Sequence, residues 1–100
     1  MNEYFTAAKA KEYTTWNKLP LIIRQSIVKA INNGVYECTI SNQNCPVSQL
    51  EQIFTNPWTK SHDLVSESIR NLLTSLGFKT ETNYVTGINF KKSELRIKWN

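Results

Sequence analysis

The chain has 100 residues, of which 40% are hydrophobic and 20% charged, and this composition fits a single globular domain spanning 1–100. The formal net charge is +4, with scattered Lys and Arg residues, so it permits nucleic-acid or nucleotide binding without demanding it. The first residues lack the basic and apolar regions of a signal peptide, and no apolar run is long enough to cross a membrane. We therefore expect a cytoplasmic protein with a thin core, which self-association into a homo-oligomer would complete.

Two helices are expected at the start of the chain. Residues 3–15 predict a weakly amphipathic helix whose narrow apolar face suits a partner subunit as well as its own core. A stronger helix is predicted to begin at Asn17 or Leu19, with Pro20 in its first turn and Gly34 just after its C-cap. Helical spacing predicts that its buried face consists of Ile23, Ile27, Ala30 and Ile31.

The middle of the chain predicts a strand, a polar loop and a short helix. Residues 35–40 alternate between the two sides as a half-buried strand does. The segment 41–61 is the expected insertion and the place where a functional loop would lie. Ser48 and Glu51 have the spacing of a capping box, which predicts a short helix that begins there and runs through Phe54.

A third main helix is expected to begin at Ser61 or Asp63 and to end at Gly77. Phe78 is then expected to contact Leu73 across a Schellman ending. Helical spacing predicts a core stripe formed by Val65, Ile69, Leu72, Leu73 and Leu76.

Two strands are expected at 78–85 and 94–99, joined by a turn region that is too long for a tight hairpin. In the second strand Leu95, Ile97 and Trp99 share one face. The complete order of elements predicts an α+β domain. Two to three main helices and a short helix would pack on a small three-stranded, mostly antiparallel sheet.

The sequence shows no spacing typical of a catalytic or metal site. His62 stands between Ser61 and Asp63, and such neighbours at the start of a helix point in different directions, unlike the members of a triad. Cys38 and Cys45 lack the partners of a zinc site, so we expect two reduced thiols. With three glycines in the chain, no glycine-rich phosphate loop can form. We therefore predict a non-enzymatic protein with no metal and no cofactor.

Cationic and aromatic side chains are the candidates for a binding site. A pocket for a small nucleotide would use the candidate ligand-binding residues Arg24, Trp58, Arg70 and Arg96. A nucleic-acid surface is the alternative, and it would use Lys79, Lys91, Lys92, Arg96 and Lys98. A competing structural interpretation is that the last strand is an edge strand, whose Lys and Arg side chains discourage aggregation.

Three segments of the sequence carry a resemblance to a known group of proteins. A helix runs into Ala30-Ile31-Asn32-Asn33-Gly34, a later helix ends in Leu73-Thr74-Ser75-Leu76-Gly77-Phe78-Lys79, and the last strand reads Leu95-Arg96-Ile97-Lys98-Trp99. This layout, over roughly residues 5–99, resembles small uncharacterised proteins of tailed bacteriophages, in which a helix-Leu-Gly-Tyr/Phe-Lys-Val element precedes an Ile-x-Trp strand. The chain departs from that pattern at 42–60 and at Thr80, where Val is common.

The resemblance implies a phage accessory protein of the host cytoplasm and supplies no site residues. Such a protein would counteract the host by binding, either inhibiting a host defence or transcription protein or sequestering a signalling nucleotide. The alternatives are a nucleic-acid-binding accessory protein and a minor virion or assembly protein.

Overall fold

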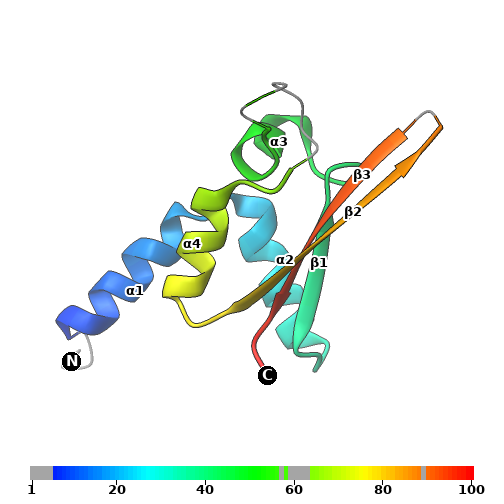
Figure 1. The fold of residues 1–100 in the computed structure, drawn as a ribbon. Coiled ribbons are helices and arrows are strands. Elements are labelled where there is room, and N and C mark those ends of the chain that lie inside the picture. Colours follow the sequence, from blue (N-terminus) through cyan, green and yellow to red (C-terminus); the bar gives the residue numbers. More distant parts are fainter. Residues whose placement is uncertain (1–5, 57, 59–63, 89) are drawn as a thin grey trace.

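The computed structural model describes residues 6–56, 58, 64–88 and 90–100. These form the elements α1 (Ala7–Lys18), α2 (Leu21–Asn32), β1 (Glu37–Ser41), α3 (Val47–Ile53), α4 (Glu67–Ser75), β2 (Lys79–Gly87) and β3 (Phe90–Lys98) (Figure 1). The predicted α+β class, with helices packed on a small three-stranded sheet, is confirmed. Among these described elements, no helix has the length and apolar character needed to cross a membrane.

The sheet has the order β1-β3-β2, and both of its strand pairs are antiparallel. The last strand is therefore the central one, and the interpretation of it as an edge strand is wrong. The helices lie on one face of the sheet, and the other face is left open (Figure 1). Ile40, Leu95 and Ile97 point to the covered face and are buried, as the alternation of β3 predicted.

The first two helices begin later than expected. α1 starts after Thr6, whose hydroxyl accepts a hydrogen bond from the Lys9 N–H at 3.2 Å, and it continues through Lys18. The chain leaves the helix at Leu19, which is extended because the following Pro20 disfavours helical geometry in the residue before it. Pro20 is the N-cap of α2 rather than a residue of its first turn. Residues 3–5 of the predicted helix lie outside the described part of the chain.

The core contains three of the four residues predicted for α2. Ile23, Ile27 and Ala30 are buried, whereas Ile31 is 55% exposed. The prediction for Ile31 was wrong because eight residues of α-helix rotate a side chain by about 80° from the starting position. The core cluster also includes Leu19, Ile40, Cys45, Ile53, Phe54, Ile69, Leu73, Leu95 and Ile97.

The predicted capping box does not form. The N-cap lies two residues earlier, at Pro46, and α3 begins at Val47, so that Ser48 and Glu51 both lie inside the helix. A proline at this position supplies the extended geometry of a cap (φ −57°, ψ 139°) without a side-chain hydrogen bond. Phe54 is fully buried at the end of the helix.

The last helix is shorter than predicted, because the chain before it is held in an extended bridge. Val65 pairs with Phe54, and the Ser66 N–H donates to the Ile53 carbonyl at 2.7 Å. α4 therefore begins at Glu67, with Ser66 as its N-cap, and Val65 is not a residue of the helical stripe. The predicted starts at 61 and 63, like the whole cluster 61–63, lie outside the described residues.

The predicted Schellman ending of α4 is confirmed. Gly77 has a φ of +92°, its N–H donates to the Thr74 carbonyl at 2.9 Å, and the Phe78 N–H donates to the Leu73 carbonyl at 3.1 Å. α2 ends in the same way at Gly34, whose φ is +74°. Each helix is thereby turned directly into the strand that follows it.

The last two strands form a tight hairpin, contrary to prediction. Their register runs without interruption from the Lys79–Lys98 pair to the Gly87–Phe90 pair, so residues 88–89 alone connect them. The prediction failed because residues assigned to a long turn continue both strands. The hairpin also extends beyond β1, which pairs only with residues 94–98 (Figure 1).

Asn42 holds the edge of β3 that β1 leaves open. Its backbone N–H donates to the Ser93 carbonyl at 3.0 Å, and its side-chain Oδ1 accepts from the Ser93 N–H at 3.0 Å. Its Nδ2 donates to the Lys91 carbonyl at 3.4 Å. The amide side chain of Asn42 thus continues the hydrogen bonding of β1 for a further step.

Candidate functional site

A polar groove lies between α4 and the hairpin of β2 and β3. Its volume is about 490 Å³, within the range of small-molecule sites. α4 contributes Glu67, Arg70, Asn71 and Thr74 to its wall, and the hairpin contributes Thr80, Thr82, Tyr84 and Ser93.

The groove is polar because every second residue of β2 on this side carries a hydroxyl group. Thr80, Thr82 and Tyr84 lie opposite Ile97, Leu95 and Ser93 of β3, so they share the covered face of the sheet. At these positions a core strand would carry large apolar side chains that fill the space against the helix. Here the hydroxyl groups leave a hollow that can offer hydrogen bonds.

Arg70 is the cation of this groove. Ile69 and Leu73 point into the core and fix the rotation of α4, so Arg70 lies outside the core on the exposed side of the helix. Within the described part of the chain Arg70 has no ion-pair partner. Glu67, one turn before it, adds the one carboxylate among the described lining residues. Tyr84 is 45% exposed, so its ring is accessible to a ligand.

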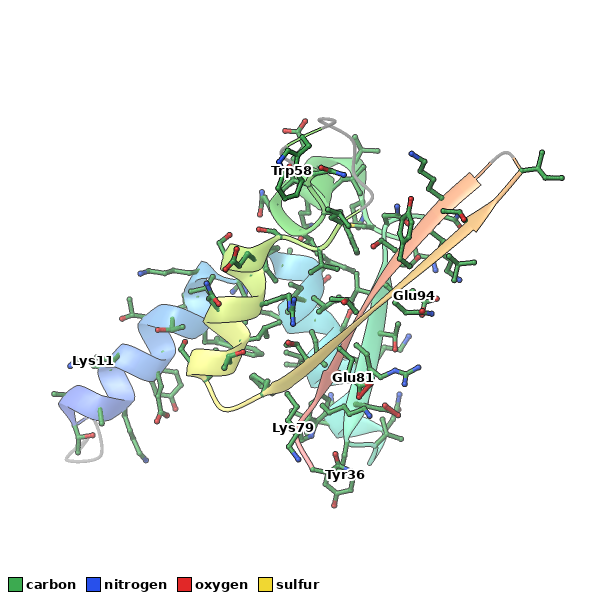
Figure 2. All side chains as sticks on the ribbon, in the orientation of Figure 1. Lys11, Tyr36, Trp58, Lys79, Glu81 and Glu94 are labelled. Atoms are coloured by element: carbon green, nitrogen blue, oxygen red, sulfur yellow. The ribbon has the colours of Figure 1, made fainter. Side chains whose placement is uncertain are left out.

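The four residues predicted for ligand binding are not brought together. Arg24 lies on α2, where its Nε donates to the Leu19 carbonyl at 3.1 Å. It lines a separate depression with Trp16 and Lys29, formed almost entirely by one face of that helix. Trp58 is 83% exposed and lies beside α3 (Figure 2). Arg96 lies on the open face of the sheet, so Arg70 alone of the four lines the groove.

Three of the cations predicted for nucleic-acid binding, Lys92, Arg96 and Lys98, are interspersed with carboxylates on the open face of the sheet. Figure 2 shows two of these carboxylates, Glu81 and Glu94, at different heights along the sheet. Among the described residues, Arg96 pairs with Glu37 of β1 at 3.9 Å, Lys98 pairs with Glu81 of β2 at 2.5 Å, and Lys92 pairs with Glu94 within β3 at 3.1 Å. The hydrogen bond from Lys98 and its positive charge hold the pKa of Glu81 below its ordinary value.

Of the other two predicted cations, one shares the open face and one does not. Lys91 is one residue from Lys92 along β3, so it points to the opposite face of the sheet. Lys79 lies on the open face opposite Lys98, and its Nζ donates to the Asn100 carbonyl at 3.2 Å. The five predicted residues therefore do not form one continuous cationic stripe.

Both cysteines are free thiols, as predicted. Burial, with a smaller contribution from the charge of Glu37, raises the pKa of Cys38 to about 11. Burial also raises the pKa of Cys45. In the described ranges no three His, Cys, Asp or Glu side chains gather into a group that would hold a metal ion.

Sequence reasoning identified Arg70 but missed the residues around it. The signal was the run of Thr80, Thr82 and Tyr84 at alternate positions, which puts hydroxyl groups on the side of the strand that faces the helices. Reading that signal required the pairing register, because alignment with the buried Leu95 and Ile97 of β3 shows which face of β2 the helices cover.

Comparison of the chain with known protein families, with curated proteins and with solved structures found no match.

Proposed function

We propose that the protein is a binding protein rather than an enzyme, and that the groove between α4 and β2 holds a small phosphorylated ligand of the nucleotide class. The observation that carries the proposal is the polar groove of about 490 Å³ around Arg70, a guanidinium without an ion-pair partner among the described residues. In the setting that the bacteriophage resemblance implies, the ligand is a signalling nucleotide of the host. The protein would sequester it in the host cytoplasm.

Each part of such a ligand has a complementary group in the groove. A guanidinium donates paired hydrogen bonds to phosphate oxygens, which is the role assigned to Arg70. The ring of Tyr84 offers a surface on which a base can stack. Asn71 and Thr82 offer donors and acceptors for base edges, and Glu67 can accept from ribose hydroxyl groups.

The composition of the groove favours binding over turnover. Its described lining residues include neither an imidazole nor a thiol. The hydroxyl groups of Thr80, Thr82 and Ser93 come from strands and have no base among the described lining side chains other than the carboxylate of Glu67. A bound nucleotide is therefore expected to be released unchanged.

The proposal is tested by calorimetry with a panel of linear and cyclic nucleotides. Mass spectrometry of the small molecules released from the heat-denatured protein provides a second readout. Arg70→Ala should weaken binding roughly tenfold or more, because a hydrogen bond to a charged group contributes about 1.5–3 kcal/mol. Arg24→Ala is the matched control, since it removes a cation that lies outside the groove.

Three results would contradict the proposal in whole or in part. If no nucleotide binds and none is released from the purified protein, the groove is not a nucleotide site. If Arg24→Ala weakens binding as much as Arg70→Ala does, the ligand lies elsewhere. Conversion of a bound nucleotide into a product would refute the non-enzymatic part of the proposal.

A further inference from the structure

β2 has an open edge along its whole length. It is an outer strand of the sheet, and no described strand pairs with its far side. Its nine residues span about 30 Å at the rise of an antiparallel strand. Backbone N–H and C=O groups that point out of such an edge are complementary to one kind of partner, another extended strand.

From Thr82 onward the edge lacks the features by which proteins discourage strand pairing. β2 contains no proline and no bulge, and its register with β3 is one to one from end to end. Its two charged residues, Lys79 and Glu81, lie at its start, and the six residues 82–87 are uncharged. β1, the opposite outer strand, is protected by its length of five residues.

We propose that β2 pairs in antiparallel orientation with β2 of a second copy, about a twofold axis at or next to Asn83. The two three-stranded sheets then join into one continuous six-stranded sheet. The pairing requires no ligand, so it is independent of the nucleotide proposal and can fail or succeed separately.

The sequence of β2 is complementary to itself in this register. With the axis at Asn83, Glu81 lies opposite Val85 of the partner subunit, and Lys79 lies opposite the partner's Gly87. Each charged end thus meets an uncharged end, whereas an axis at Glu81 would place two carboxylates face to face. Thr82 lies opposite the partner's Tyr84 across the axis, and such a pair of a β-branched and an aromatic residue stabilises paired strands.

The pairing also places the two grooves at the junction between subunits. Thr80, Thr82 and Tyr84 of β2 line the groove, so the strand that forms its wall is the strand that joins the copies. Each groove would then be bordered by the sheet of the other subunit.

Two proline variants test the pairing and control each other. Neighbouring residues of an outer strand direct their N–H groups to opposite edges of that strand. Of the two variants Thr82→Pro and Asn83→Pro, one therefore removes a hydrogen bond to β3. The other removes a donor from the open edge, where proline is tolerated. Thermal unfolding shows which variant keeps the wild-type stability. Light scattering after size exclusion then gives the mass of each protein.

We expect the wild-type protein to have twice the mass of the chain and the stable proline variant to be a monomer. A wild-type protein that is monomeric at every concentration overturns the proposal. A stable proline variant that remains dimeric overturns it as well, because the contact would then lie elsewhere.

Cross-linking tests the register. Asn83→Cys is expected to form a disulfide between subunits on mild oxidation, because residues next to a twofold axis of paired strands lie within reach of such a bond. Val28→Cys, an exposed position on α2, is the control and should stay unlinked. Peptide mapping distinguishes these links from any formed by the native cysteines. Equal linking of both variants would refute the assigned axis.

Discussion

Replacing Asn42 with alanine removes the side chain that pairs with β3 beyond the end of β1. The Ser93 N–H then loses its acceptor, which lies 3.0 Å away. Ser93 is 3% exposed, so water does not readily replace that acceptor. An unsatisfied buried donor costs about 1–3 kcal/mol. Taking about 2 kcal/mol, the melting temperature of a domain of this size should fall by roughly 8–16 °C.

Two further variants separate the causes of that loss. Asn42→Asp keeps an oxygen for the Ser93 N–H and loses the donor to the Lys91 carbonyl, whose contact is longer at 3.4 Å. We therefore expect it to lose less than half as much stability as Asn42→Ala. Gln43→Ala, at the exposed neighbouring position, should stay within about 0.5 kcal/mol of the wild type.

The measurements are denaturant unfolding followed by circular dichroism and hydrogen exchange of the Ser93 amide by NMR. Ser93 should exchange faster in Asn42→Ala than in Asn42→Asp. The reasoning is refuted if the Ala and Asp variants are equally destabilised. It is also refuted if exchange at Ser93 is unchanged when Asn42 is replaced with alanine.

Three other perturbations have defined outcomes. Gly77→Ala should lower the free energy of unfolding by about 1–2 kcal/mol, because a φ of +92° strains any residue that has a Cβ. The strain is in the backbone, since no atom lies within 4 Å of the added Cβ. A neutral result in thermal unfolding would contradict this. The Cys38 thiol, with its pKa raised from 9.0 to about 11, should contribute stability below pH 9.0 that is lost as the pH rises through the folded value. Comparing the pH dependence of unfolding in wild type and Cys38→Ala checks this, and identical alkaline limbs would contradict it. The Lys98–Glu81 ion pair should stabilise the fold above the ordinary pKa of Glu81 and lose that effect as the pH falls through the lowered value. Lys98→Gln should raise the midpoint of the Glu81 carboxyl signal in an NMR titration, and an unchanged midpoint would show that Lys98 is not the cause.

The elements that the sequence predicted best are those with strong local signals. The Schellman ending at Gly77 was predicted in detail, because glycine is the residue that best adopts the required positive φ. The alternation of Leu95 and Ile97 likewise revealed the buried face of β3. In both places local chemistry and tertiary packing favour the same conformation.

The errors occurred where two local rules or distant contacts competed. Ser48 was predicted as the N-cap of α3, whereas Pro46 occupies that position, because its backbone already has the geometry of a cap. Val65 fits the helical stripe of α4 but pairs with Phe54, a contact that no local pattern indicates. The length of the hairpin was missed because glycine and serine favour turns in isolation, whereas here pairing with the facing strand holds Gly87 and Ser93 extended.

The candidate site was only partly predictable for a related reason. Arg70 was identified from its charge, but charge alone also indicated Arg24 and Arg96, which lie on other surfaces. Choosing among the three requires the strand order and the rotation of α4. Both are set by long-range packing of residues such as Leu73.

The central position of β3 has a consequence for the synthesis of the protein. Among the described elements β3 comes last in the chain, yet it is the strand to which both β1 and β2 pair. On the ribosome, α2 with β1 and α4 with β2 emerge before the strand that joins them. Their apolar faces stay exposed until β3 leaves the exit tunnel, since flanking strands have nothing to pair with earlier. We therefore expect the domain to complete its folding only after β3 has been translated, and in that interval its exposed apolar faces are accessible to chaperones and proteases.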